Sequence, residues 1–358
     1  IISKNLYEHN VKAPINLDPK NIIDTDEPTL LIDLPSPRDK DYIKTITFKN
    51  ENSVSAHITY YFDKTFGVSK WDKVLSILSG VYRGLDIGKE GFRGIEKEFL
   101  DELSRTNIIG VDLGFRLWGW KRQPLIKAFY RTLIPYIPGY SGDPSRVDAM
   151  LKNTLKLENV EDVMGEHIFT SSGKEKIKTF LQYLDNTIEY LNEDERKKLL
   201  LKLVGYVYQF NIKDKKPLDL IEVLGAINVF TSLKQENPLF VSLLSIDDTL
   251  IPQILVFYYD IIDEFCLEVS TIINQYLKGE KKTIEVEDTL KRPELFIDIL
   301  KSIDKLPQNS VFYIRLNGEL ITSLSEYLRV KKEVEKTYTS CSEYQLCRVD
   351  EKGDLIKA

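Results

Sequence analysis

One long helix constrains what this chain can fold into more than any other feature of its sequence. Apolar side chains recur three or four residues apart along one stretch, so they line a single face of a helix. They are Ile254, Phe257, Ile261, Phe265, Val269 and Ile273. The predicted helix begins at Asp247 or Asp248, runs to Lys278 and ends at Gly279, a residue type typical of helix C-termini. Beyond Gly279 the period changes, so this helix joins two differently built parts of the chain.

The order of the apolar patterns predicts an α/β fold in three parts. We expect residues 1–150 to form an α/β domain with a parallel sheet, and residues 151–279 a helical region that includes the long helix. Residues 280–358 are predicted to form a small C-terminal α/β domain. Within the middle part, the pattern from Ser172 to about Lys234 is almost wholly helical, with a capping box at Asn192 to Glu195.

The first part opens with a predicted buried strand, Thr29 to Leu34. Asp33 lies near the carboxyl end of this strand, which is where open α/β sheets build their sites. The predicted elements that follow are helices from Ser53 to Phe66, from Ser69 and through Phe92 to Leu103, an extended stretch from Ile108 to Trp118, and a helix from Gln123 to Leu133. The first two helices have serine N-caps, and Gly67 follows the first as its stop.

The C-terminal part has strand patterns instead of a long helical period. Thr283 to Val286 and Val311 to Leu316 are predicted strands, and Asn317-Gly318 is a dipeptide typical of tight hairpin turns. The order of strands and short helical patterns predicts a small mixed sheet here.

Composition excludes several classes of protein. The chain has 358 residues, of which 42% are hydrophobic, so it is not a disordered chain. Its formal net charge of −6 argues against binding duplex DNA over the whole surface, although a local basic groove stays open. The cysteines are Cys266, Cys341 and Cys347, and this sparse, odd number favours a reducing cytoplasm over a disulfide framework. No apolar run is long enough to span a bilayer, and we expect no membrane partner.

Common catalytic groups are scarce. The histidines are His9, His57 and His167, which lie far apart in the sequence, and each is better explained as a structural residue than as a metal ligand. No glycine-rich phosphate loop of the Walker type is present. Gly84 to Gly88 is glycine-spaced but does not follow a predicted strand, so we interpret it as a helix end and turn. The sequence predicts no cofactor and no metal.

One segment mixes aromatic and cationic side chains, and two interpretations of it stay open. Bases of a single strand can stack on rings while phosphates bind cations, which makes this segment a candidate contact for nucleic acid or for a partner. The alternative is a set of core tryptophans beside a solvated basic edge. The candidate residues are Arg116, Trp118, Lys121, Arg122, Lys127, Arg131 and Tyr136.

The same segment resembles a family. Arg116 to Gly119, Gln123 to Ala128 and Pro135 to Gly142 resemble the run "R-L-F-G … R-P-L-H-K-A … P-Y-I-P-G-x-S-G" of archaeal RecJ-like proteins in the DHH phosphoesterase superfamily. Ser79 to Gly84 is similar to the family's "A-G-A-I-G-D" motif, and Ile221 to Asn228 to one of its later helices. The likeness covers roughly residues 29 to 275.

The departures from the family concern its metal ligands. Family enzymes hold two divalent metals with several aspartates and a pair of histidines, and a two-metal mechanism needs every ligand. Here Asp33 stands at the position of one aspartate, while the Asp-His-His motif is missing between Leu34 and Phe48. The last catalytic aspartate of the family falls on Gly84, with Asp86 two residues away. The remnant positions are therefore Asp33, Gly84 and Asp86, and we expect no catalytic residue among them.

The resemblance implies a protein kept for its surfaces. A DHH fold without metals is typical of the cell division cycle subunit of the CMG helicase, which implies binding to the GINS complex and stimulation of the MCM motor in DNA replication. Residues 1–150 would then be a degenerate DHH-type domain, and residues 280–358 the DHH-associated domain. The expected location is the cytoplasm, at a nucleoid-associated replication fork, with single-stranded DNA as a further partner.

Two other functions remain as alternatives. One is a RecJ-type exonuclease specific for single strands, against which the missing ligands argue. The other is a free-standing single-strand DNA-binding protein, against which the acidic net charge argues. For a protein partner, the expected surfaces are an exposed sheet edge or the segment Val311 to Arg329.

Overall fold

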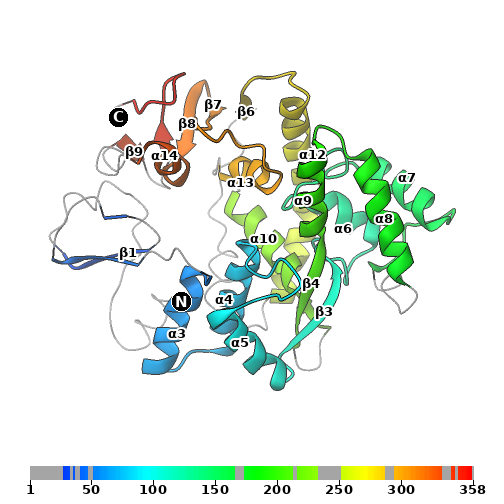
Figure 1. Ribbon diagram of the computed structural model, residues 1–358, viewed down its shortest axis with the longest axis horizontal. Coiled ribbons are helices and arrows are strands. Elements are labelled where there is room, and N and C mark those ends of the chain that lie inside the picture. The colour runs from blue at the N-terminus through cyan, green and yellow to red at the C-terminus, as the bar shows by residue number, and fades with distance from the viewer. Residues whose placement is uncertain are drawn as a thin grey trace.

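The computed structural model describes residues 27–32, 35–36, 41–46, 51–165, 173–212, 216–232, 251–286, 294–332, 340–342 and 346–356. Asp33 and two of the histidines, His9 and His167, lie outside these residues, so nothing is concluded about their surroundings. The fold is mixed α/β, as the sequence predicts. In Figure 1 helices α3 to α5 lie at the bottom, helices α6 to α9 at the right, and the C-terminal strands at the top.

The N-terminal elements form where their local signals predict them, but the first strand is only partly buried, since Leu30 and Ile32 are 44% and 43% exposed. Strand β1 (Thr29–Ile32) pairs in parallel with β2 (Ile43–Ile46), which is the parallel pairing expected for this part of the chain. Three helices follow: α3 (Val54–Thr65), α4 (Lys70–Tyr82) and α5 (Gly94–Arg105). Ser53 caps α3, and Ser69 forms a capping box with Asp72 at the start of α4, because each hydroxyl accepts a hydrogen bond from an otherwise unpaired N–H.

A three-stranded antiparallel sheet corrects the expectation of an almost wholly helical middle. Its order is β3-β4-β5, formed by Ile109–Phe115, Val204–Phe210 and Leu218–Asp219. Strand β4 was missed because it follows a helix without a break, although its valines, tyrosines and phenylalanine are typical strand residues. Since β3 pairs with β4 along its whole length, the sheet also crosses the boundary predicted at residue 150.

The helical layer surrounds the long helix. Its members are α6 (Leu125–Arg131), α7 (Pro144–Leu155), α8 (Gly173–Thr187), α9 (Glu193–Leu203), α10 (Leu220–Ser232) and α12 (Ile251–Leu277). The capping box of Asn192 and Glu195 starts α9 as predicted. Helix α12 packs against α10, α6 and β6. The predicted stripe is buried except around Phe257, which is 53% exposed, because Tyr258 and Ile262 occupy the inward positions there. Over the described part of the chain, no helix combines the length and apolarity that crossing a membrane requires.

The C-terminal part is a five-stranded mixed sheet of order β6-β7-β8-β10-β9 with two helices. The strands are Ile284–Val286, Ile314–Leu316, Glu319–Ser323, Leu346–Arg348 and Cys341–Ser342, in that spatial order, and the helices are α13 (Glu294–Ser302) and α14 (Leu324–Lys331). The predicted turn joins β7 to β8, with positive φ at Asn317 (51°) and Gly318 (85°).

The cysteines correct a second expectation. Antiparallel pairing of β9 with β10 sets Cys341 opposite Cys347, and the two form a disulfide. Cys266 is free and buried in α12. The number of cysteines in a sequence does not reveal such a pair, because the register of two short strands brings it together.

One hydrophobic core serves all three predicted parts. It extends from Trp71 in α4 through Phe115, Trp118 and Ile262 to Phe312 beside the C-terminal sheet. Two small clusters, one around Leu324 and one around Tyr327, complete the interior of the C-terminal sheet. The three parts therefore fold against one another.

Candidate functional site

Two of the remnant positions, Gly84 and Asp86, lie in the turn after α4. Gly84 has a φ of +70°, a conformation that favours glycine, and the chain turns there so that Asp86 points inward. Asp86 is only 1% exposed. The glycine-spaced segment is thus a helix end and turn, as predicted.

Asp86 is fully engaged by its neighbours. The two terminal nitrogens of Arg116 bind its two carboxylate oxygens, the longer of these hydrogen bonds being 3.0 Å between NH2 and Oδ1. The Tyr208 hydroxyl donates to Oδ2 over 3.0 Å. Burial, and after it the nearby Asp86 carboxylate, raises the pKa of Tyr208 far above its ordinary value, so this hydroxyl stays a donor. A carboxylate that accepts three hydrogen bonds, two of them from a paired guanidinium, is a poor ligand for a divalent ion.

Asp33 lies outside the described residues, so the described structure tests the neighbourhood of Asp86 without it. Within the described ranges, no three histidine, cysteine or acidic side chains come close enough to share a metal ion. His57 lies in α3, where partial burial lowers its pKa below the ordinary value. In this structure the Asp86 carboxylate forms an ion pair with Arg116.

The aromatic and cationic segment lies mostly inside the protein. Trp118 and Tyr136 are fully buried, so neither can stack on a base or contact a partner in this structure. The Trp118 indole N–H donates to the carbonyl of Ile134 over 3.2 Å, and the Tyr136 hydroxyl donates to Oδ1 of Asn274 over 2.9 Å. Both rings are part of the core, as the alternative interpretation of this segment expects.

The cations of the segment bind carboxylates of the same chain. Arg116 is bound to Asp86, Lys121 to Asp112, Arg122 to Glu222 and Arg131 to Asp263. Of the seven candidate residues, Lys127 is the one with an exposed side chain. A phosphate backbone would therefore have to compete with ion pairs that already exist, and the structure offers no basic groove along this segment.

The pair of Arg131 and Asp263 joins α6 to the long helix. Arg131 donates from Nε to Oδ1 of Asp263 over 2.6 Å and from NH2 to Oδ2 over 2.8 Å, a bidentate geometry. The Tyr130 hydroxyl adds a third hydrogen bond of 2.8 Å. Burial alone would raise the pKa of Asp263, but the hydrogen bonds from Arg131 and Tyr130 outweigh it and the pKa lies below its ordinary value.

A second buried network surrounds Glu222 in α10. Gln123 and Tyr259 both donate to Oε1 of Glu222, and Nε of Arg122 lies 3.3 Å from Oε2. Burial raises the pKa of Glu222, against the opposing charge of Arg122. The segment from Arg116 to Gly142, which carries the family resemblance and is called the family-like segment below, is thus held to α10 and α12 by polar contacts.

Asp219 lies at the start of α10 and is less well paired. Its Oδ1 accepts a hydrogen bond of 2.9 Å from the N–H of Ile221, as a helix cap does. Among the described residues, none donates a hydrogen bond to its Oδ2. Burial, and then the charge of Glu222, raises the pKa of Asp219 to about 7.

An open cleft lies between the helical layer and the C-terminal part. It has a volume of about 690 Å³ and carries more carboxylates than cations. The lining residues are Asn192, Asp194, Glu195 and Lys198 of α9; Ile297, Asp298 and Lys301 of α13; Asp304, Leu306 and Gln308 after α13; and Ser325, Glu326 and Arg329 of α14. Mixed charges on three helices suit a polar protein surface better than a phosphate backbone.

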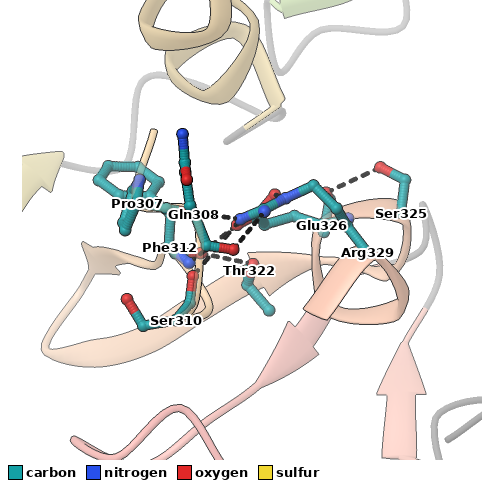
Figure 2. Close-up of polar contacts among 9 residues, drawn as sticks. Pro307, Gln308, Ser310, Phe312, Thr322, Ser325, Glu326 and Arg329 are labelled. Carbon is teal, nitrogen blue, oxygen red and sulfur yellow. Dashed lines mark hydrogen bonds and ion pairs between the residues drawn. The ribbon is translucent and has the colours of Figure 1, made fainter. Parts of the chain in front are cut away.

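Arg329 organises one wall of this cleft. Figure 2 shows it between Glu326 and the loop that carries Pro307, Gln308 and Ser310. Its guanidinium binds both oxygens of Glu326 at 2.7 Å and the carbonyls of Gln308 and Pro307 at 3.1 and 2.9 Å. Glu326 in turn accepts a hydrogen bond of 3.0 Å from the N–H of Phe312. One side chain thus connects α14 with the loop that follows α13.

The sequence analysis did not predict the cleft, or the carboxylates that bind the cations of the aromatic and cationic segment. One sequence signal for buried carboxylates was present. Asp219 and Glu222 lie within the apolar run from Leu218 to Leu224, so their carboxylates are expected to be buried. The predicted partner segment Val311 to Arg329 is mainly interior, since Val311, Phe312, Ile314 and Tyr327 are all at most 5% exposed. Only its hairpin turn and one face of α14 are open to a partner.

Comparison with known proteins places the fold. No protein-family model matches the chain, and no curated protein matches its sequence. Among solved structures, the crystal structure of CDC45 from Entamoeba histolytica is similar, with a TM-score of 0.50 and 10% sequence identity. The similarity covers 89% of this chain and 80% of that one. The chain therefore has a CDC45-like fold, whereas the resemblance to archaeal RecJ-like proteins stays a prediction from the sequence.

Proposed function

We propose that this chain is a non-catalytic subunit of a replicative helicase assembly, which binds the GINS complex and through it stimulates the MCM motor in DNA replication. The observation that carries the proposal is the CDC45-like fold over 89% of the chain. The family-like segment in the core supports the same assignment.

The state of Asp86 supports the absence of catalysis. In a two-metal phosphoesterase the aspartates must be free to bind metal, but here Arg116 and Tyr208 use both carboxylate oxygens. Freeing Asp86 for a metal would leave the Arg116 guanidinium buried without its partner. We therefore expect no digestion of single-stranded DNA or RNA by the purified chain with Mg²⁺ or Mn²⁺.

Nuclease assays with the variants Asp33→Ala and Asp86→Asn test this part of the proposal. Neither substitution should change the trace activity of the preparation. Processive digestion from the 5′ end that Asp33→Ala abolishes would contradict the proposal and favour the RecJ-type exonuclease.

Gel filtration tests the partner. The chain and its cognate GINS complex should elute together at micromolar concentration, and unwinding by MCM plus GINS should increase when the chain is added. Separate elution together with unchanged unwinding would contradict the proposal. Strong, salt-dependent binding of the chain alone to a single strand would then favour the DNA-binding alternative.

A further inference from the structure

Strand β3 lies at the edge of its sheet. In the order β3-β4-β5, β4 covers one side of β3, and the described residues supply no strand for the other side (Figure 1). An open edge carries unpaired N–H and C=O groups that can bind another strand. Which groups are unpaired depends on the phase of the ladder between β3 and β4.

Two hydrogen bonds at the ends of the ladder fix that phase. The N–H of Arg116 donates to the carbonyl of Leu203 over 2.7 Å, and the N–H of Asn211 donates to the carbonyl of Ile108 over 2.8 Å. In an antiparallel pair, every second residue exchanges hydrogen bonds with the neighbour. The even-numbered residues of β3 therefore bond to β4, and the N–H and C=O groups of Val111 and Leu113 point to the open edge.

The side chains at this edge are also unusual. Val111 is 41% exposed and Leu113 is 62% exposed, although both lie on the same face as Ile109 and Phe115, which are buried. An apolar strand face thus begins in the core and continues to the surface at the edge where no described strand pairs with β3. Asp112 lies between them on the other face, with an exposed carboxylate that Lys121 contacts.

We infer that the outer edge of β3 binds an extended strand of a partner protein by adding it to the β3-β4-β5 sheet. Main-chain hydrogen bonds to Val111 and Leu113 would provide affinity, and side chains at alternating positions would provide specificity. The partner strand has apolar residues opposite Val111 and Leu113. Between them it has a basic residue that faces Oδ1 of Asp112, because this carboxylate is 62% exposed and Lys121 binds its Oδ2.

A second copy of this chain fits the edge poorly. The antiparallel register that sets Val111 of one copy against Leu113 of another also sets Asp112 against Asp112. Like charges directly opposite each other destabilise a strand pair. The occupant is therefore a different protein. This inference rests on the proposed function, since it names the surface that a protein-binding subunit would use.

The test uses the full chain and a displayed library of ten-residue peptides with apolar residues at alternating positions. Leu113→Pro removes an N–H that β4 does not use, so the fold is kept while one edge hydrogen bond is lost. We expect enriched peptides with the apolar-basic-apolar pattern, and an affinity at least about tenfold lower for Leu113→Pro. Leu201→Gln, at a helical position that is 68% exposed, is the control and should leave binding unchanged.

Two outcomes overturn the inference in this experiment: no enriched peptide, or enriched peptides that bind Leu113→Pro as tightly as the original chain. Amide hydrogen exchange provides a second measurement. In the free chain Val111 and Leu113 should exchange quickly and Gly110, Asp112 and Gly114 slowly, and the peptide should protect the first two. If the amides of Val111 and Leu113 exchange slowly in the free chain, another segment of this chain or a second copy covers the edge. That result also overturns the inference.

The edge and the proposed function can fail separately. If Leu113→Pro elutes with GINS as the original chain does and no peptide binds, the edge is wrong and the function stands. If peptides bind at the edge but GINS elutes alone, the edge stands and the function is wrong.

Discussion

Two arginine–carboxylate pairs, each with two hydrogen bonds, have different surroundings in this protein. Arg116 and Asp86 are 7% and 0% exposed in their side chains, and their contact closes the turn after α4. Arg329 and Glu326 are 36% and 2% exposed, and their contact supports the wall of an open cleft. Both guanidinium groups bind both oxygens of their carboxylate.

The difference shows that an arginine–carboxylate pair can fill a buried position, as Arg116 and Asp86 do, or hold the wall of an open cleft, as Arg329 and Glu326 do. Inside the protein, removing one partner leaves a charge without water or a counter-ion, so each residue of the pair depends strongly on the other. At the cleft, Arg329 is 36% exposed, so that water can reach the Glu326 carboxylate once the arginine side chain is removed and replace part of what is lost. Three substitutions test this comparison, from the largest expected effect to the smallest.

Arg116→Ala should have the largest effect. It leaves the Asp86 carboxylate buried with the Tyr208 hydroxyl as its remaining side-chain donor, and we expect a loss of about 3–5 kcal/mol in the free energy of unfolding. Urea unfolding followed by tryptophan fluorescence measures it. The double variant Asp86→Leu with Arg116→Met removes both charges and should recover most of the loss. A single variant as stable as the original chain would show that the pair does not close this site.

Asp219→Asn extends the comparison to a third buried carboxylate. Among the described residues, no arginine donates a hydrogen bond to Asp219. The raised pKa of about 7 means that the folded chain binds a proton more tightly than the unfolded chain, whose Asp219 titrates near the ordinary 3.8. Asp219 therefore costs stability increasingly as the pH rises from about 4 to about 7, and by a constant amount above that.

The asparagine keeps the cap and removes the charge, so the variant should be more stable than the original chain by about 4 kcal/mol at pH 8, with no gain near pH 4. Urea unfolding at several pH values measures the difference. Asp143→Asn, an exposed helix cap that accepts the N–H of Arg146, is the control and should show no such pH dependence. A gain that does not change with pH would contradict the assignment.

Arg329→Ala should have the smallest effect, about 1 kcal/mol, because its guanidinium is partly solvated. The loss should be local: amide exchange of residues 307–312 becomes faster, since the carbonyls of Pro307 and Gln308 lose their donor. Arg348→Ala breaks an exposed pair with Glu319 in the same sheet and serves as the control. If Arg329→Ala and Arg348→Ala change the free energy of unfolding and the amide exchange of residues 307–312 equally, Arg329 contributes no more than an ordinary surface pair.

Local features of this fold were predictable from the sequence. The caps at Ser53, Ser69 and Asn192 depend on residues three positions apart, and the structure confirms each of them. The end of α12 before Gly279 and the hairpin at Asn317-Gly318 are equally local. Strand β4 was missed because its alternation begins inside a stretch dominated by helical period.

The candidate site was harder to predict because its partners are distant in the sequence. Arg116 meets Asp86 over 30 residues, and Arg131 meets Asp263 over 132. A mixture of cations and aromatic residues has the same sequence pattern on a surface as in a core, and only the tertiary fold shows where the counter-charges lie. The sequence therefore left two interpretations of this segment open, and the burial of Trp118 and Tyr136 agrees with the interpretation as core residues.

The pairing of β3 with β4 has a consequence for how the chain is made. Phe115 pairs with Val204, so a ribosome must synthesise helices α6 to α9 before the ladder can begin. At ordinary rates of translation β3 waits on the order of ten seconds with both of its edges open. A nascent strand with Val111 and Leu113 is prone to pair with neighbouring chains during that time, and the charge of Asp112 between them opposes such pairing. Holding chaperones should therefore bind the nascent chain most strongly before β4 leaves the ribosome.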